Sequence, residues 1–134
     1  MAVQTPIPVH FEQVFPDRAW LVSTVEPIPA YDKASGAKLG QAKHPVTGEP
    51  MWEVTVHDGD PTVKGPAKSV KVKLASPYQP VPPTPLPGLP FAPVEFEEMA
   101  ITPYVVEVMP GRFKVAYSIQ ARGMVAPAGY ETAA

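Results

Sequence analysis

The sequence predicts an all-β domain, and three observations carry this prediction. Proline is abundant, at 20 of 134 residues, and each proline fixes φ and removes a backbone donor, which leaves little room for helices. Several short segments alternate apolar and polar residues, as strands with one buried face do. Turn-forming residues separate these segments. We expect a single domain over residues 1–127 and a flexible C-terminal tail over residues 128–134.

The first three expected strands follow from their apolar patterns. Residues 18–26 are apolar on both faces, until the prolines that follow end the strand or push it to an edge. Residues 51–57 alternate strictly, with a tryptophan and two valines expected inside. Residues 69–75 repeat this alternation and place Lys71 and Lys73 on the outer face. The long loop between the first two strands is rich in turn residues.

A proline-rich crossover, residues 77–93, connects the third expected strand to the fourth. Its eight prolines exclude both a helix and a central strand. Apolar side chains lie between the prolines, which predicts a stiff strap that docks these side chains across the domain. The expected docking residues are Tyr78, Val81, Leu86, Leu89 and Phe91.

The last two expected strands follow this strap. Residues 94–108 form one extended segment whose apolar phase slips at Glu97-Glu98, which indicates a β-bulge. Residues 109–112 are typical of a hairpin turn, and residues 113–122 alternate again. Five strands, a long first loop and a long third connection predict a small five-stranded OB-like barrel, and a β-sandwich fits almost as well.

Composition excludes several classes of protein. The absence of cysteine rules out disulfides, thiolate catalysis and cysteine-bound zinc. We see no signal peptide and no apolar segment of membrane length in the sequence, so we expect a cytoplasmic protein. Residues 57–60 are the one cluster that could bind a metal or perform acid–base chemistry, and a polar turn at a strand end explains them. We therefore expect no enzyme, no metal and no cofactor.

The net charge is −2, but the charges are segregated along the chain. Lys71 and Lys73 could follow a phosphate backbone, and the lysines of the first loop could close over an oligonucleotide. A solvated strand face and a lysine-rich loop explain the same residues without a ligand. Bases would stack on exposed aromatic rings, and Tyr78 and Tyr104 are further candidates for this role. The expected nucleic-acid-binding residues are Lys71, Lys73, Lys33, Lys38, Lys43, Lys114, Arg122, Trp20 and Tyr31.

Short runs over nearly the whole chain, from Ile7 to Pro127, resemble one known family. The runs are Val14-Phe15-Pro16-Asp17, residues 22–27, Tyr31-Asp32, Met51-Trp52-Glu53-Val54, Lys71-Val72-Lys73, residues 87–96, Ile101-Thr102-Pro103-Tyr104, Ala116-Tyr117-Ser118 and Ala121-Arg122-Gly123-Met124. They look like the "plasmid replication, integration and excision activator" proteins, which are encoded on actinobacterial integrative and conjugative elements. The resemblance implies a role in activating the replication and excision of such an element.

Two functions are compatible with these observations. The first is a sequence-tolerant single-stranded DNA-binding protein, active as a homodimer, that supports replication, integration or excision of a mobile element. An exposed edge beside Pro27 and Pro29 could support the dimer. The alternative is an interaction module or regulator that binds the element's replication or recombination proteins without touching DNA. The proline strap and the acidic residues 95–98 favour this alternative.

Overall fold

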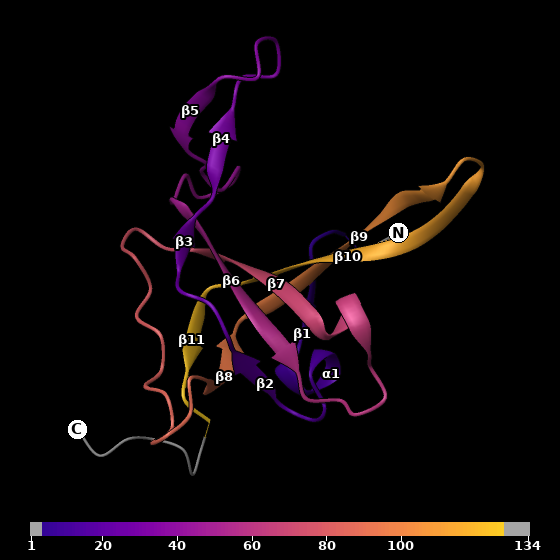
Figure 1. Cartoon of the computed structure of the whole chain (residues 1–134). Helices are drawn as coiled ribbons and strands as arrows, with labels where there is room; N and C mark the ends of the chain where they lie inside the picture. Colours follow the sequence, from indigo (N-terminus) through magenta and orange to yellow (C-terminus); the bar gives the residue numbers. More distant parts are fainter. Residues whose placement is uncertain (1–3, 128–134) are drawn as a thin grey trace.

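The computed structural model describes residues 4–127 and is mostly β (Figure 1). Within these residues, nine strands form one sheet that curls into an open half-barrel, and two more pair as a separate hairpin. The all-β prediction is therefore confirmed. The tail predicted at residues 128–134 lies outside the described residues. The strands are β1 (Ile7–Val9), β2 (Ala19–Leu21), β3 (Glu26–Pro27), β4 (Pro29–Tyr31), β5 (Lys38–Gln41), β6 (Met51–Asp58), β7 (Ser69–Ala75), β8 (Ala92–Glu97), β9 (Met99–Met109), β10 (Arg112–Ala121) and β11 (Gly123–Val125).

The strands of the sheet follow the order β1-β9-β10-β7-β6-β2-β8-β11, and β3 also pairs with β6. Neighbours are antiparallel, except that β10 and β7 run parallel. β8 continues into β9, and β10 into β11, each through a bend. The same bent segment therefore borders β10 at one end of the curl and β2 at the other. Strands from both halves of the chain thus enclose one interior.

The bend between β8 and β9 lies where the sequence predicts a bulge. Glu98 adopts the left-handed region at φ 50°, which is uncommon for a residue other than glycine. The Arg122 amide donates a hydrogen bond to the Glu97 carbonyl at 3.0 Å, beside the bend. Because Glu98 interrupts the alternation, Phe96 and Met99 are both buried. Residues 98–99 and 121–122 separate the two ladders, with two residues on each segment, so the phase slip marks a bend and not the predicted bulge.

Two sequence predictions in the first half of the chain need correction, although β6, β7 and β10 lie where they are expected. Residues 18–26 do not form one strand, because β2 ends at Leu21 and the Ser23 hydroxyl then accepts a hydrogen bond from the Thr55 amide at 2.8 Å. The first loop is not free of regular structure, since β4 and β5 pair there as a hairpin. Gly36, at φ 74°, provides the left-handed position that their connection needs.

The core lies inside the curl and is apolar throughout. Three phenylalanines form a cluster at one end, with ring centroids of Phe11 and Phe15 5.5 Å apart and those of Phe15 and Phe96 6.4 Å apart. Trp52 packs against the core, as its alternation predicts, and its Nε1 donates to the Ser76 carbonyl at 3.0 Å. The core cluster consists of Phe15, Ala19, Leu21, Val25, Val54, Val56, Val72, Leu74, Ala92, Val94, Phe96, Met99, Ile119 and Ala121.

Helix is confined, in the described part of the chain, to two short segments: α1 (Phe11–Val14) and the 3-10 helix η1 (Gly65–Lys68). α1 begins with a capping box, in which the backbone amide of His10 donates a hydrogen bond to Gln13 Oε1 at 2.7 Å. Within residues 4–127, no helix combines the length and the apolar character that a membrane span requires.

The proline-rich connection between β7 and β8 follows the predicted course but does not dock as predicted. Tyr78 and Val81 are 81% and 83% exposed, and Leu89 and Phe91 are also exposed. Among the five expected docking residues only Leu86 is half-buried. Prolines lack the N–H groups that would tie the strap to the sheet, and a side-chain bond to the body comes instead from Gln79 Nε2, which donates to the Val25 carbonyl at 3.2 Å. The prediction of a docked strap is therefore wrong for most of its side chains.

Candidate nucleic-acid interface

The outer face of the sheet carries the lysine pair that the sequence predicts there. The alternate residues of β7 are buried, so Lys71 and Lys73 point outward, and both are exposed. Lys71 lies opposite Thr55 of β6. Lys73 lies between Glu53 of β6 and Gln120 of β10. Both ammonium groups therefore sit near the middle of the curled sheet.

A surface groove of about 490 Å³ opens beside this lysine pair, where β10 separates from β7. The parallel ladder between the two strands pairs residues 119–121 with residues 72–74, and the strands splay apart before it. Side chains from both faces of the sheet can therefore reach the groove, including the rings of Tyr104 and Tyr117. The full lining is Glu53, Ser69, Val70, Lys71, Lys73, Tyr104, Tyr117, Ser118 and Ile119.

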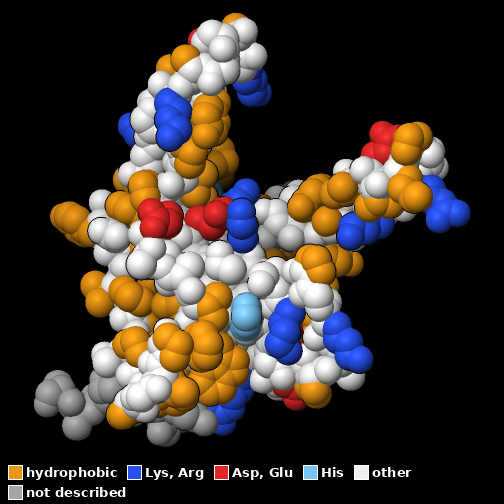
Figure 2. All heavy atoms as spheres, in the orientation of Figure 1, with side chains coloured by type: hydrophobic (Ala, Val, Ile, Leu, Met, Phe, Trp, Pro, Cys, Tyr) orange, Lys and Arg blue, Asp and Glu red, His pale blue; other side chains and the backbone are white. Residues whose placement is uncertain are grey.

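One acidic residue, Glu53, also lines the groove. Its Oε1 lies 3.8 Å from Nζ of Lys71, whose side chain is 70% exposed. An exposed ion pair of this kind contributes about 0–1 kcal/mol, so the Lys71 ammonium can exchange the carboxylate for a phosphate at little cost. Among residues 4–127, no carboxylate lies within ion-pair distance of Lys73. Acidic and basic side chains meet in this region, between the two projecting hairpins (Figure 2).

The lysines of the first loop lie elsewhere, on and beside the β4–β5 hairpin, which projects from the body (Figure 1). Lys33 lies in its turn, and Lys38 in β5 is paired directly across the ladder with Tyr31 of β4. Lys43 follows the hairpin and forms an isolated bridge with Pro50. The Tyr31 ring is 56% exposed. This hairpin therefore holds an aromatic ring opposite a cation, apart from the groove.

The turn of this hairpin depends on the Asp32 carboxylate. It accepts hydrogen bonds from the Ala34 amide at 2.9 Å and from the Ser35 hydroxyl at 3.0 Å. These bonds favour the ionised form and hold the pKa of Asp32 below its ordinary value, with the Ala34 amide as the larger cause. A depressed carboxyl pKa stabilises the folded turn above the pKa of the unfolded chain, and this stabilisation is lost as the pH falls through the folded pKa.

We therefore expect acid to loosen the β4–β5 turn. The amide signal of Ala34 in NMR spectra should shift, and its exchange protection should fall, as the pH drops from about 5 to about 2. Asp32→Asn is the matched control, because its side-chain oxygen can still accept the Ala34 bond but does not titrate. An Ala34 signal with the same pH dependence in both proteins would contradict the role given to Asp32.

Two more predicted residues lie outside the groove. Lys114 is exposed on β10, farther out on the same outer face, opposite Val106 of β9. Arg122 lies at the bend into β11, where its Nη2 is 3.2 Å from Glu49 Oε1 and its Nε is 3.6 Å from Glu98 Oε2. Two carboxylates thus compensate its charge, and the structure does not bring Arg122 to the lysine pair.

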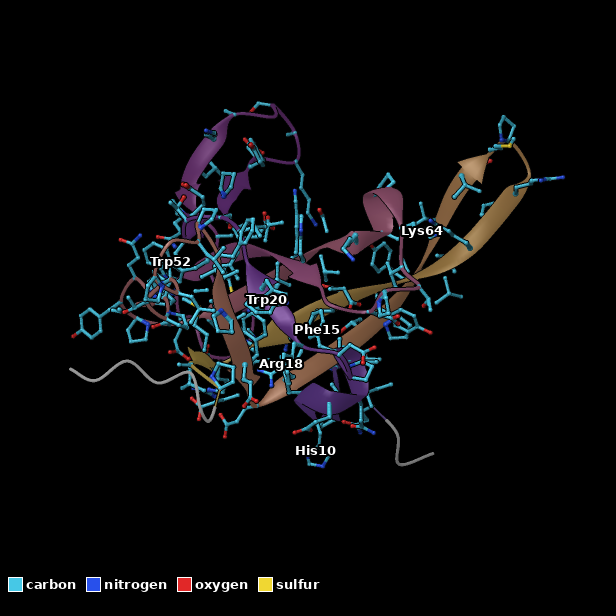
Figure 3. The ribbon with its side chains drawn as sticks, turned by 60° about the horizontal axis from the view of Figure 1, so that its bottom comes forward. His10, Phe15, Arg18, Trp20, Trp52 and Lys64 are labelled. Atoms are coloured by element: carbon cyan, nitrogen blue, oxygen red, sulfur yellow. The ribbon has the colours of Figure 1, made fainter. Side chains whose placement is uncertain are left out.

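Trp20 is also separate from the groove. It lies on β2 opposite His57 and lines a pocket of about 390 Å³ with Lys68 and with Leu89 and Phe91 of the strap. Figure 3 shows Trp20 near the middle of the body and Trp52 beside the strap. Trp20 is therefore a half-exposed ring on the far side of β6 from the lysine pair.

Local hydrogen bonds account for the polar residues 57–60. Asp58 Oδ1 accepts the Asp60 amide at 2.9 Å. The Asp60 carboxylate accepts the amide of Thr62 at 2.9 Å and its hydroxyl at 2.8 Å. The Thr62 amide is the main cause that lowers the pKa of Asp60. In the part of the chain that the structure describes, no group of three or more His, Asp or Glu residues is placed to hold a metal ion.

Neither Tyr117 nor Glu53, both of which line the groove, is identified as part of a site by the sequence. Tyr117 lies two residues before Ile119 on the same face of β10, so the alternating pattern predicts a core position. However, β7 pairs with β10 only from residue 119 onward, so β7 no longer lies beside β10 at Tyr117. Glu53 is expected only to point outward, and its place beside Lys71 depends on the register between β6 and β7. The alternating pattern carries no signal for either, because it reports the face of a residue and not where the neighbouring strand ends.

Comparisons of the chain with protein-family models, curated proteins and solved structures found no match. The family resemblance drawn from the short sequence runs therefore stays a prediction.

Proposed function

We propose that this protein binds single-stranded DNA with little sequence preference, and that it supports the replication, integration or excision of a mobile genetic element. The observation that carries the proposal is one open groove in which Lys71 and Lys73 lie beside the rings of Tyr104 and Tyr117. A single strand offers phosphates to cations and unpaired bases to aromatic rings, so its binding needs both kinds of side chain together. The role in a mobile element rests on the family resemblance.

The order of strand pairing supports an OB-like barrel as the form of this binding domain. Counted by continuous segments, β2, β6, β7, β8–β9 and β10–β11 are five strands. The fourth segment borders both β10 and β2, as a sheet that closes on itself requires. Barrels of this kind bind oligonucleotides on an outer strand face flanked by loops. The groove and the β4–β5 hairpin would supply those two parts.

Single-stranded DNA is favoured over a duplex by the shape of the site. No helix among the described residues can enter the major groove of a duplex, because the longest helices span four residues. A net charge of −2 also gives little general attraction to a duplex. A groove lined by tyrosines matches instead the stacking that unpaired bases allow.

Binding of a labelled oligo-dT of about thirty nucleotides, measured by fluorescence anisotropy at two salt concentrations, tests the proposal. We expect tight binding that weakens with salt and exceeds the binding of a matched duplex. Replacing Lys71 and Lys73 together by alanine should lower the affinity and reduce the salt slope by roughly 1.4, at about 0.7 per phosphate contact.

One control variant makes this test specific. Glu53→Gln removes the carboxylate beside Lys71 and should tighten binding, because it leaves both cations in place. An unchanged slope in the Lys71/Lys73 variant would contradict the placement. No binding by the unmodified protein at low salt would contradict the function and favour the protein-interaction module.

A further inference from the structure

The β9–β10 hairpin extends past the body as an arm, which we define as residues 103–117 (Figure 1). Its two strands pair with each other in an unbroken antiparallel ladder between residues 100–107 and 113–120. Beyond the short β7 ladder at its root, no other described strand pairs with it on the β10 side. The arm nevertheless carries hydrophobic side chains along its length (Figure 2). No other described strand covers this apolar surface along most of the arm.

One face of the arm continues the core. Ile119 of β10 is buried, and alternation places Tyr117, Val115 and Phe113 on the same face. Val105 of β9 lies opposite Val115 and extends this face across the ladder. These four residues, Val105, Phe113, Val115 and Tyr117, are 68%, 63%, 57% and 58% exposed, and we call them the inner patch. The apolar face that lines the core thus extends along the arm, where its side chains are exposed to solvent.

The inner patch has the size of the apolar part of a protein interface. Two half-exposed aromatic rings and two valines present roughly 400–500 Å² of apolar surface. A standard interface buries about 800 Å² on each partner, of which a little over half is apolar. Monomeric proteins rarely expose a continuous apolar patch larger than a few hundred Å². The inner patch therefore fits an interface better than a solvent-exposed surface.

We propose that the inner patch binds the inner patch of a second copy of this chain, forming a two-fold dimer through the β9–β10 arms. In such an interface the same surface serves both partners, so one association covers both patches. The arm carries Glu107 on the inner face, opposite Phe113, and Arg112 at its tip. Charges of both signs let two identical arms complement each other when they cross in opposite directions. The apolar faces of the two hairpins then stack as the layers of a small sandwich.

The dimer leaves most of the proposed DNA-binding face open. Lys114 and Tyr104 lie on the outer face of the arm, as do Lys71 and Lys73 on the body. Tyr117 lies at the boundary, since it belongs to the inner patch and also lines the groove. The inference rests on the apolar arm alone and does not depend on the proposed function. It replaces the edge beside Pro27 and Pro29 as the dimer contact.

Analytical ultracentrifugation of the full chain without DNA tests the dimer. We expect a reversible dimer at micromolar concentrations. Val115→Asp places a charge in the centre of the inner patch and should weaken association at least about 10-fold. Val108→Asp is the matched control, because Val108 lies on the same arm outside the inner patch at 49% exposure, and this variant should remain dimeric. Circular dichroism should show the same strand content for both variants.

The possible results of these association measurements distinguish the dimer from its alternatives. A chain that stays monomeric at the highest concentrations would overturn the dimer and leave the patch for a different protein. Equal association of the Val115 and Val108 variants, whether both dimerise or both dissociate, would overturn the assignment to the inner patch. The Lys71/Lys73 variant should dimerise normally, so failure of DNA binding and failure of the dimer are distinguishable.

Discussion

Replacing Gly59 by alanine is expected to destabilise the fold by about 2–4 kcal/mol. A Cβ at this position would lie 2.0 Å from the carbonyl oxygen of Asp17 and 3.0 Å from that of Arg18. The backbone approaches closely here because Arg18 adopts a left-handed conformation, at φ 79°, and its carbonyl accepts the Gly59 amide at 2.9 Å. The added methyl group must break this bond or move the turn that leads into β2. Thermal unfolding, followed by the fluorescence of the two tryptophans, measures the loss.

Gly123→Ala is the matched control for this prediction. Its Cβ would meet only the end of the Glu97 side chain, at 3.1 Å, and that side chain can rotate away. We expect this variant to unfold within a few degrees of the unmodified protein. A Gly59→Ala protein as stable as Gly123→Ala would show that the approach of the two backbones is not tight in solution.

Replacing Phe15 by alanine is expected to cost about 3–5 kcal/mol. Phe15 is 2% exposed and is the largest of the fully enclosed side chains among residues 4–127. Its ring packs against Phe11 of α1 and Phe96 of β8, so its removal opens a cavity between the N-terminal segment and the sheet. The cost adds the lost transfer free energy to the free energy of that cavity. Urea denaturation should show a lower midpoint with little change in slope.

Tyr78→Ala provides the comparison for Phe15→Ala. It removes a ring of similar size from the strap, where the side chain is 81% exposed, and should change stability by no more than about 0.5 kcal/mol. Similar losses in the two variants would mean that the strap packs on the body in solution, and that the phenylalanine cluster is not the main contact at that end of the core.

The parts of the fold that the sequence predicts best are those with a strict two-residue period. β6, β7 and β10 lie where alternation places them, and the phase slip at residues 97–98 locates the bend at Glu98. A period determines which residues share a face. It does not determine how far a neighbouring strand extends, so burial on β10 is predicted correctly at Ile119 and not at Phe113.

The errors have physical causes that lie outside any one segment. The β4–β5 hairpin is short and rich in turn residues, so its strands carry no alternation long enough to detect. The apolar residues of the strap predict docking, but its prolines lack the donors that would fix it to the sheet. Apolar composition alone therefore does not establish burial.

The candidate site was predictable in part. Lys71 and Lys73 stand out because their strand is short and alternates cleanly. Their partners depend on register and on the parallel pairing of β10 with β7, which brings Tyr104 and Tyr117 to the same groove. Such long-range pairing is invisible in one sequence. The same limit applies to Arg122, whose charge predicts a place in the site but which lies between two glutamates.

The exposed strap has a consequence for the unfolded chain. β2 pairs with β8, with Ala19 opposite Val94, so folding must close a long loop that contains the strap, at a cost in chain entropy. Proline restricts the unfolded chain before any contact forms, and a compatible proline stabilises by about 0.4–1 kcal/mol through this effect. Eight prolines between residues 77 and 93 reduce the number of conformations that the connection between β7 and β8 can adopt in the unfolded chain. A segment that leaves most of its apolar side chains exposed can thus stabilise the fold, because it limits the alternatives to the folded state.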